Sequence, residues 1–91
     1  MAETAEDRQK RMRMRSWRRG MKEMDLILGP FSDAQLQELS PGDLELYDAL
    51  LSENDQDLLR WMMGQAAAPD RFAQIVARIA AFAHGRLAQR N

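Results

Sequence analysis

A chain of 91 residues is long enough for one small domain with a single modest core, which excludes a catalytic domain beside a regulatory one. A hydrophobic share of 45% and a charged share of 30%, with a net charge of −1, are typical of a globular protein. The absence of cysteine excludes disulfides, thiolate chemistry and zinc–sulfur sites, and no apolar run is long enough to span a membrane. The acidic stretch 1–7 resembles neither a signal peptide nor an organelle transit peptide, so we expect a cytoplasmic location.

The first two predicted helices lie on either side of a glycine. Strong helix formers predict a helix from about Glu6 to Trp17, with Met12 and Trp17 facing inward. Apolar residues then recur at steps of three and four. This spacing predicts one amphipathic face that is broken or bent near Gly20 and ends at Gly29-Pro30. The residues of this face are Trp17, Met21, Met24, Leu28 and Phe31.

Capping signals predict where the next helices begin and end. The stretch from Ser32 to Gln35 fits a capping box and predicts the start of a short helix. Ser40-Pro41 predicts another helix start, with serine as N-cap and proline in the first turn. Asn54 or Asp55 caps a fourth segment, which Gly64 ends in the left-handed conformation.

The clearest helix is the last one, which follows the connector 66–69 and carries a long apolar stripe. The residues expected to be buried in the later segments are Leu36, Leu39, Leu44, Tyr47, Leu50, Leu51, Leu58, Leu59, Trp61, Met62, Phe72, Ile75, Val76, Ile79 and Phe82. Among the methionines, we expect Met24 and Met62 in the core, and Met14 and Met21 at the surface.

Together these segments predict an all-α fold, a compact five-helix bundle with short loops. No internal repeat or low-complexity segment divides the chain, so one domain is expected. We assign residues 11–87 to the bundle, 1–10 to a flexible N-terminal extension and 88–91 to a C-terminal tail.

Residues suited to catalysis or metal binding are scarce. His84 is the only histidine and stands near a helix end, so no Ser-His or Cys-His nucleophile pair has support. The acids lie at caps and on polar helix faces, where solvation explains them without a metal ion. None of the five glycines belongs to a phosphate-binding loop. We therefore expect no catalytic residues, no metal ligands and no stably bound cofactor.

The charges change sign abruptly after Gly20. Eight Lys and Arg residues and no acid lie between Arg8 and Lys22, whereas ten carboxylates and no base lie between Glu23 and Leu59. Such a boundary gives the folded protein an oriented field, which suits the choice of a partner surface.

A partner surface also gives the glycine at this boundary a purpose. A plain ion pair between Arg19 and Glu23 is worth only about 0.3–0.5 kcal/mol and does not explain Gly20. If a partner docks there, the guanidinium of Arg19 can donate hydrogen bonds to a carboxylate or to carbonyls of the partner. Glu23 can then hold that guanidinium or accept a hydrogen bond from an N–H of the partner. The bare Gly20 then lets the two surfaces close.

The stretch Arg19-Gly20-Met21-Lys22-Glu23 resembles the Arg-Gly-x-x-Glu motif of the SdhE family of flavinylation factors, also called succinate dehydrogenase assembly factors. The resemblance continues in order and spacing over roughly Arg11 to Gly85. It includes Leu26, Leu28, Pro30-Phe31, Leu39-Ser40, Asp55-x-Asp57-Leu58-x-x-Trp61 and Pro69. One departure is Gln56, where many relatives have proline, and it leaves the motif intact.

Membership of this family implies a five-helix bundle that binds the flavoprotein subunit of succinate dehydrogenase, and in some bacteria that of fumarate reductase. It implies that the chain promotes covalent attachment of FAD to a histidine of that subunit, so the partner carries the FAD. The motif residues carried over as partner-binding are Arg19, Gly20 and Glu23, with Arg18 and Met21 as flanking contacts. We expect a monomer when free, without nucleic acid and without membrane insertion.

Two other interpretations stay open. A nucleic-acid-associated or regulatory helical module would use the basic segment Arg8 to Lys22 as an arm. Against it, the pI of about 5.8 and the ten carboxylates that follow the arm disfavour phosphate. A structural interaction protein without any link to flavin is the plainer alternative.

Overall fold

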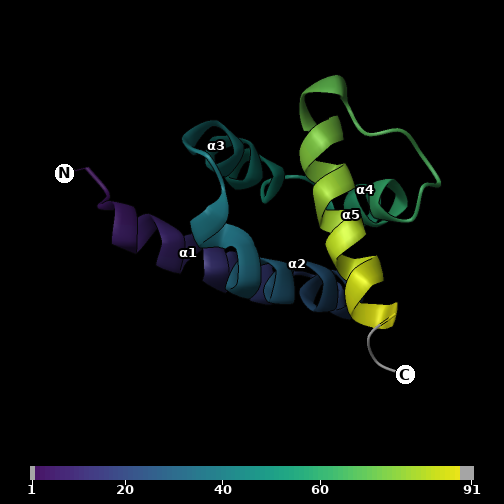
Figure 1. Ribbon diagram of the computed structural model, residues 1–91, viewed down its shortest axis with the longest axis horizontal. Helices are drawn as coiled ribbons and strands as arrows, with labels where there is room; N and C mark the ends of the chain where they lie inside the picture. Colours follow the sequence, from purple (N-terminus) through teal and green to yellow (C-terminus); the bar gives the residue numbers. More distant parts are fainter. Residues whose placement is uncertain (1, 89–91) are drawn as a thin grey trace.

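Five α-helices joined by short connections make up the computed structural model, which describes residues 2–88 (Figure 1). They are α1 (Ala5–Trp17), α2 (Lys22–Gln35), α3 (Pro41–Leu50), α4 (Asp55–Met62) and α5 (Ala73–Ala88). The 3₁₀ helices η1 (Leu36–Glu38) and η2 (Asp70–Phe72) follow α2 and precede α5. Residues 2–88 contain no strand, so the predicted all-α five-helix fold is confirmed. Within the same range, no helix has the length and apolar character needed to cross a membrane.

Helices α1 and α2 lie side by side as an antiparallel hairpin (Figure 1). The chain leaves the helical conformation between Arg18 and Met21, which confirms the predicted break near Gly20. Asp25 fixes this turn because its carboxylate accepts the backbone N–H of Arg19 at 2.6 Å. Helices α4 and α5 then pack against α2 and against each other, which closes the core.

Helix α2 does not end at Gly29-Pro30 as predicted but continues through both residues. The predicted capping box is also wrong, because Ser32 is a buried residue of α2 whose hydroxyl donates to the carbonyl of Gly29 at 2.7 Å. Pro30 has no N–H for the carbonyl of Leu26, four residues earlier, and Arg86 donates to that oxygen at 3.4 Å. Burial of the apolar residues around the proline outweighs the local helix-ending signal.

Gly29 is the point of close contact between the two helices of the hairpin. The indole of Trp17 lies against it, and a Cβ added to Gly29 would overlap that ring. The indole Nε1 also donates to Asp33, at 3.2 Å and 3.3 Å from the two carboxylate oxygens. Trp17 is therefore only partly inward, since 41% of it is exposed, whereas Met12 is fully buried as predicted.

We expect Gly29→Ala to lower the free energy of unfolding by about 1–2 kcal/mol. Displacing the indole should cost more than the roughly 1 kcal/mol that alanine adds to helix propensity. Urea denaturation followed by circular dichroism measures the change. Gly85→Ala is the matched control in α5, because a Cβ there meets nothing within 4 Å, and it should be neutral or stabilising. Equal stabilisation of both variants would contradict a tight contact at Gly29.

Local caps explain most of the helix boundaries. The side chains of Ser40 and Asn54 cap α3 and α4 as predicted, and Gly64 follows α4 with a φ of 73° in the left-handed region. The boundary predicted at residue 11 does not appear as a break, because Thr4 caps α1 and residues 5–10 form its first turns. Apart from Ala88, which ends α5, the predicted tail lies outside the described residues.

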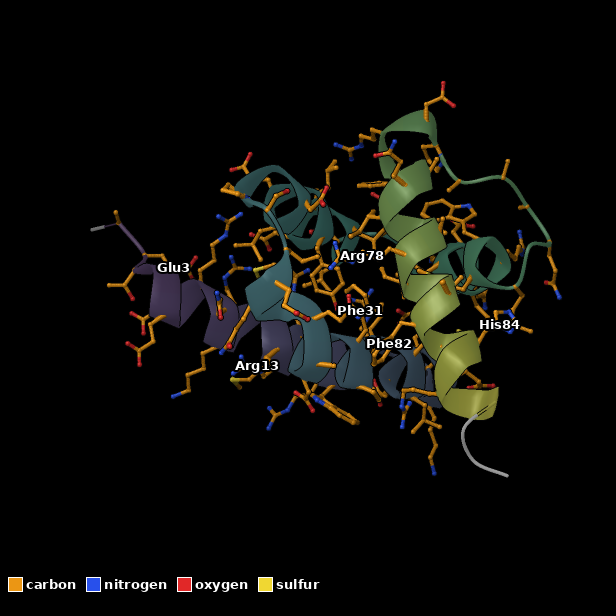
Figure 2. All side chains as sticks on the ribbon, viewed as in Figure 1. Glu3, Arg13, Phe31, Arg78, Phe82 and His84 are labelled. Atoms are coloured by element: carbon orange, nitrogen blue, oxygen red, sulfur yellow. The ribbon has the colours of Figure 1, made fainter. Side chains whose placement is uncertain are left out.

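The core draws apolar side chains from all five helices. Tyr47 is fully buried near its centre, where its hydroxyl lies 2.7 Å from Ser16 Oγ, and burial raises the pKa of Tyr47 to about 12. Phe31 packs on Tyr47 and meets Phe82 edge-on, with ring centroids 5.7 Å apart (Figure 2). The buried apolar residues are Met12, Met24, Leu28, Phe31, Leu36, Leu39, Tyr47, Leu50, Leu51, Leu58, Met62, Phe72, Ile75, Val76 and Ile79. Of the residues predicted to be buried, Leu44, Leu59, Trp61 and Phe82 are partly buried against this core.

Candidate functional site

The predicted partner-binding residues lie together at the turn between α1 and α2. Arg18, Arg19, Gly20 and Met21 form the turn, and Glu23 lies in the first turn of α2. Arg18, Gly20 and Glu23 are exposed, while Met21 is half-buried against the core rather than exposed as predicted. The side chain of Arg19 turns inward, so that it is much less exposed than Arg18, Gly20 and Glu23.

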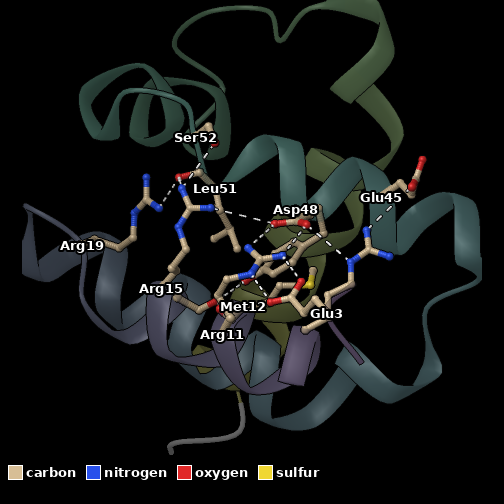
Figure 3. A network of polar contacts seen from close by, with 12 residues as sticks. Glu3, Arg11, Met12, Arg15, Arg19, Glu45, Asp48, Leu51 and Ser52 are labelled. Carbon is tan, nitrogen blue, oxygen red and sulfur yellow. Dashed lines mark hydrogen bonds and ion pairs between the residues drawn. The ribbon is translucent and has the colours of Figure 1, made fainter. Parts of the chain in front are cut away.

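Arg19 binds the turn between α3 and α4 of its own chain. Its Nε donates to Asp55 Oδ1 at 2.7 Å, and its two terminal nitrogens donate to the carbonyls of Leu51 at 2.6 Å and Glu53 at 3.0 Å. Figure 3 shows Arg19 reaching toward the Leu51 carbonyl. Only 8% of the Arg19 side chain and 17% of the Asp55 side chain are exposed. The planar guanidinium thus satisfies carbonyls that the end of α3 leaves without helical partners.

Asp55 joins the first two residues of the motif, Arg19 and Gly20. Its Oδ1 accepts from the Arg19 side chain, while its Oδ2 accepts the backbone N–H of Gly20 at 2.7 Å. A Cβ added to Gly20 would lie 3.1 Å from that same Oδ2, which is tighter than ordinary contact. The backbone of Gly20 lies outside the left-handed region, so the glycine serves the approach of Asp55 and not an unusual conformation. Asp55 therefore holds the turn in place through two hydrogen bonds.

The predicted clasp of Arg19 and Glu23 can be compared with the contacts that these residues make within the chain. The fork of Arg19 does meet a carboxylate and carbonyls, but they belong to its own chain and not to a partner. Glu23 is exposed and is not among the acceptors of Arg19. Sequence reasoning did not connect Asp55 with Arg19 and Gly20, because only the folded chain brings it to the turn. Partner contacts by Arg19, Gly20, Glu23, Arg18 and Met21 stay predictions.

An apolar groove continues from the motif between α2 and α4. We call it the motif groove; it has a volume of about 400 Å³ and is lined by Glu23, Leu26, Ile27, Leu59, Met63 and Gln65. Two of its side chains are unusually exposed for apolar residues, Leu26 at 54% and Met63 at 62%. Exposed apolar side chains beside a charged rim are typical of protein-binding surfaces. Sequence reasoning missed this groove, because no local pattern shows that α2 and α4 adjoin.

The basic run before the motif is largely paired within the chain. Arg11 donates to both carboxylate oxygens of Asp48, at 2.9 Å and 2.8 Å, and Arg8 approaches the same carboxylate at 3.4 Å. Arg15 donates to the carbonyl of Leu51, which Arg19 also reaches. Figure 3 shows Arg11 reaching toward Asp48, and Arg15 toward Leu51. The charge boundary in the sequence is therefore partly neutralised in the fold, which weakens the interpretation of this run as a nucleic-acid-binding arm.

The ion pairs of Asp48 should make the stability of the fold depend on pH. Hydrogen bonds from Arg11 lower the pKa of Asp48 below its ordinary value of 3.8, and they raise the pKa of Arg11. A carboxyl group whose pKa is lowered on folding stabilises the fold at every pH above the pKa that it has in the unfolded chain. This contribution is lost as the pH falls through the lower pKa of the folded state.

We expect Asp48→Asn to lower the free energy of unfolding by about 1 kcal/mol at about pH 7. The difference from the parent protein should narrow as the pH falls below 3.8 and through the lower pKa of Asp48 in the folded protein, where Asp48 of the parent protein also becomes neutral. Urea denaturation across this pH range measures both effects. Glu45→Gln is the control, because Glu45 is 78% exposed and should contribute little. A difference that does not change with pH would contradict the ion-pair explanation.

His84 and the acidic side chains are the remaining groups considered for catalysis or metal binding. His84 is exposed on α5, on the opposite side of the view in Figure 2 from Arg13. It lines a small apolar pocket of about 120 Å³ with Ile27, Met62 and Met63. Within residues 2–88, no group of three or more His, Asp or Glu side chains is close enough together to hold a metal ion.

Comparison with known proteins gives a family match over most of the chain. The sequence model of the Sdh5 family, described as "Flavinator of succinate dehydrogenase", matches residues 10–83. This range includes the motif at the α1–α2 turn, Asp55 and the motif groove.

Individual relatives agree with this match. The chain is 42% identical to the "FAD assembly factor SdhE" of Pseudomonas putida over 68% of its own length and 74% of that protein. It is 34% identical to the protein of the same name from Legionella pneumophila, over 81% of its own length and 94% of that protein. It is 33% identical to the "Succinate dehydrogenase assembly factor 2, mitochondrial" of Dictyostelium discoideum, of which it spans only half the length. The chain therefore belongs to the family of succinate dehydrogenase flavinators, as the resemblance of its Arg-Gly-x-x-Glu motif predicts.

Proposed function

We propose that this chain is an assembly factor that binds the flavoprotein subunit of succinate dehydrogenase and promotes covalent attachment of FAD to it. The observation that carries the proposal is the family match over residues 10–83, which contains the complete motif. The geometry adds support, because Gly20 is exposed on a turn that Asp55 holds through two hydrogen bonds. The exposed Glu23 follows this turn and lines the motif groove.

The factor acts by binding and not by bond-making chemistry of its own. The reacting histidine and the flavin both belong to the partner subunit. A rigid surface that binds one conformation of that subunit raises the population in which the two reacting groups are held in bonding geometry. Glu23 offers its carboxylate to a donor of the partner, and the motif groove takes an apolar side chain beside it.

The finer features belong to the same proposal. The chain carries no FAD or metal of its own, is a monomer when free and works in the cytoplasm. The flavoprotein subunit of fumarate reductase is a second partner of the same kind.

The direct test measures covalent flavin fluorescence of the flavoprotein subunit in denaturing gels, with and without this protein. Labelling should rise several-fold when the factor is present. Equal labelling in its absence would overturn the proposal.

A groove variant separates the docking surface from the fold. We expect Leu26→Asp to lower labelling at least tenfold, because the new aspartate would place a charge in the apolar groove. The protein should stay folded, because Leu26 is exposed. Ala77→Asp, at an exposed position of α5, is the matched control and should keep full labelling. Full labelling with Leu26→Asp would exclude the groove as the docking surface.

A further inference from the structure

Helix α1 carries a second exposed apolar surface that the motif groove does not include. A pocket of about 220 Å³ is lined by Lys10, Arg13, Met14, Trp17 and Arg18, and we call it the α1 pocket. Met14 is 47% exposed and Trp17 is 41% exposed, which makes them the second pair of large exposed apolar residues after those of the motif groove. The two pockets share no residue.

The indole at this pocket is held in one place. Gly29 of α2 leaves room for the ring on one side, and Asp33 accepts its Nε1 proton. A large aromatic side chain that is fixed before binding loses little conformational entropy when a partner covers it. Such preformed aromatic positions are favoured at the centre of protein interfaces.

The cations of α1 and of its C-terminal end form two groups with different surroundings. Arg8, Arg11 and Arg15 point to the carboxylate of Asp48 or to the end of α3. The group at the α1 pocket, Lys10, Arg13 and Arg18, surrounds the exposed apolar residues instead. Figure 2 shows Arg13 on the outer side of α1.

One carboxylate moderates the charge of this second group. Asp33 lies 3.9 Å from Arg13 and is half-exposed. Three cations against one such carboxylate leave the rim of the pocket positively charged.

We propose that the α1 pocket binds an acidic protein segment that carries one bulky apolar side chain. The pocket volume suits a single large side chain, and the cationic rim complements Asp or Glu residues on either side of it. A concave apolar floor favours such an anchor over a membrane surface, which needs projecting apolar side chains. Phosphates of a nucleic acid would use the rim but not the apolar floor. This inference does not depend on the proposed flavin function.

The test uses the full chain with Trp61→Phe, so that Trp17 alone reports on binding by its fluorescence. The probe is the blocked peptide Glu-Asp-Phe-Asp-Glu, compared with the same peptide carrying Ser for Phe and with one carrying Lys for every acid. We expect a saturable shift of the Trp17 emission, at least fivefold weaker affinity for the Ser peptide, and no binding of the Lys peptide.

Variants of the chain make the test specific. Lys10→Glu combined with Met14→Ser should weaken binding at least tenfold, because it removes rim charge and floor together. Arg60→Glu removes one exposed cation on α4, away from the pocket, and should leave the affinity unchanged. Equal affinity of the double variant and the parent chain would overturn the proposal. Tighter binding to phosphatidylglycerol vesicles or single-stranded RNA, lost in the double variant, would also overturn it.

Discussion

Gly20→Arg is expected to abolish co-purification of the flavoprotein subunit, with a loss of affinity of about 100-fold or more, while the helical circular dichroism is largely kept. The Cβ alone would lie 3.1 Å from Asp55 Oδ2, so the carboxylate must move by a few tenths of an ångström, which strains its two hydrogen bonds. The new guanidinium would also compete with Arg19 for Asp55 and would project from the exposed turn toward the partner. Both effects act on the binding surface and leave the core untouched.

Gly85→Arg is the matched control for this prediction. It makes the same chemical change at an exposed position of α5 where an added Cβ meets nothing within 4 Å. It should leave both co-purification and circular dichroism unchanged. If Gly20→Arg lost its helical signal as completely as its partner, Gly20 would serve the fold instead of the docking surface.

Arg19→Ala is expected to lower the free energy of unfolding by about 3 kcal/mol, because Asp55 loses its cationic partner and the Glu53 carbonyl loses its side-chain donor, while the Leu51 carbonyl keeps only Arg15. For a domain of this size, the melting temperature should fall by roughly 12 °C or more. Arg19→Lys should recover only part of the loss, since one ammonium group cannot match a planar fork on three acceptors. Thermal unfolding followed by circular dichroism measures the series.

Arg18→Ala is the neighbouring control, because Arg18 is exposed and its removal should change stability by less than about 0.5 kcal/mol. Partner binding should be measured well below the lowered melting temperature, where Arg19→Ala is folded. A variant that keeps full stability but loses the partner would show that Arg19 contacts the partner directly, against the geometry described above.

Local signals predicted most of the helices correctly. Serine, asparagine and glycine at helix ends act through their own backbone neighbours, so Ser40, Asn54 and Gly64 can be recognised without knowing the fold. The end predicted at Gly29-Pro30 failed for the opposite reason. There the contact with Trp17 and the donor from Arg86 come from distant residues, and they stabilise a helix that the local sequence disfavours.

The contacts within the candidate site could not be predicted from the sequence. The motif and the charge boundary both point to the turn between α1 and α2, because both are features of neighbouring residues. The acceptors of Arg19, and the groove between Leu26 and Met63, depend on how α3 and α4 pack against the hairpin. The family pattern includes Asp55 but gives no partner for it, and no spacing singles out Asp48, so the ion pairs of both acids could only be found in the folded chain.

The hydrogen bonds of Asp55 have a consequence for any attempt to imitate or inhibit this protein. Arg19 and Asp55 are separated by 36 residues in the chain, yet the shape of the exposed turn depends on both. A short synthetic peptide copied from the motif would lack the carboxylate and carbonyls that orient it. A working mimic would have to be discontinuous, with the turn cross-linked to a second segment that supplies residues 51–55.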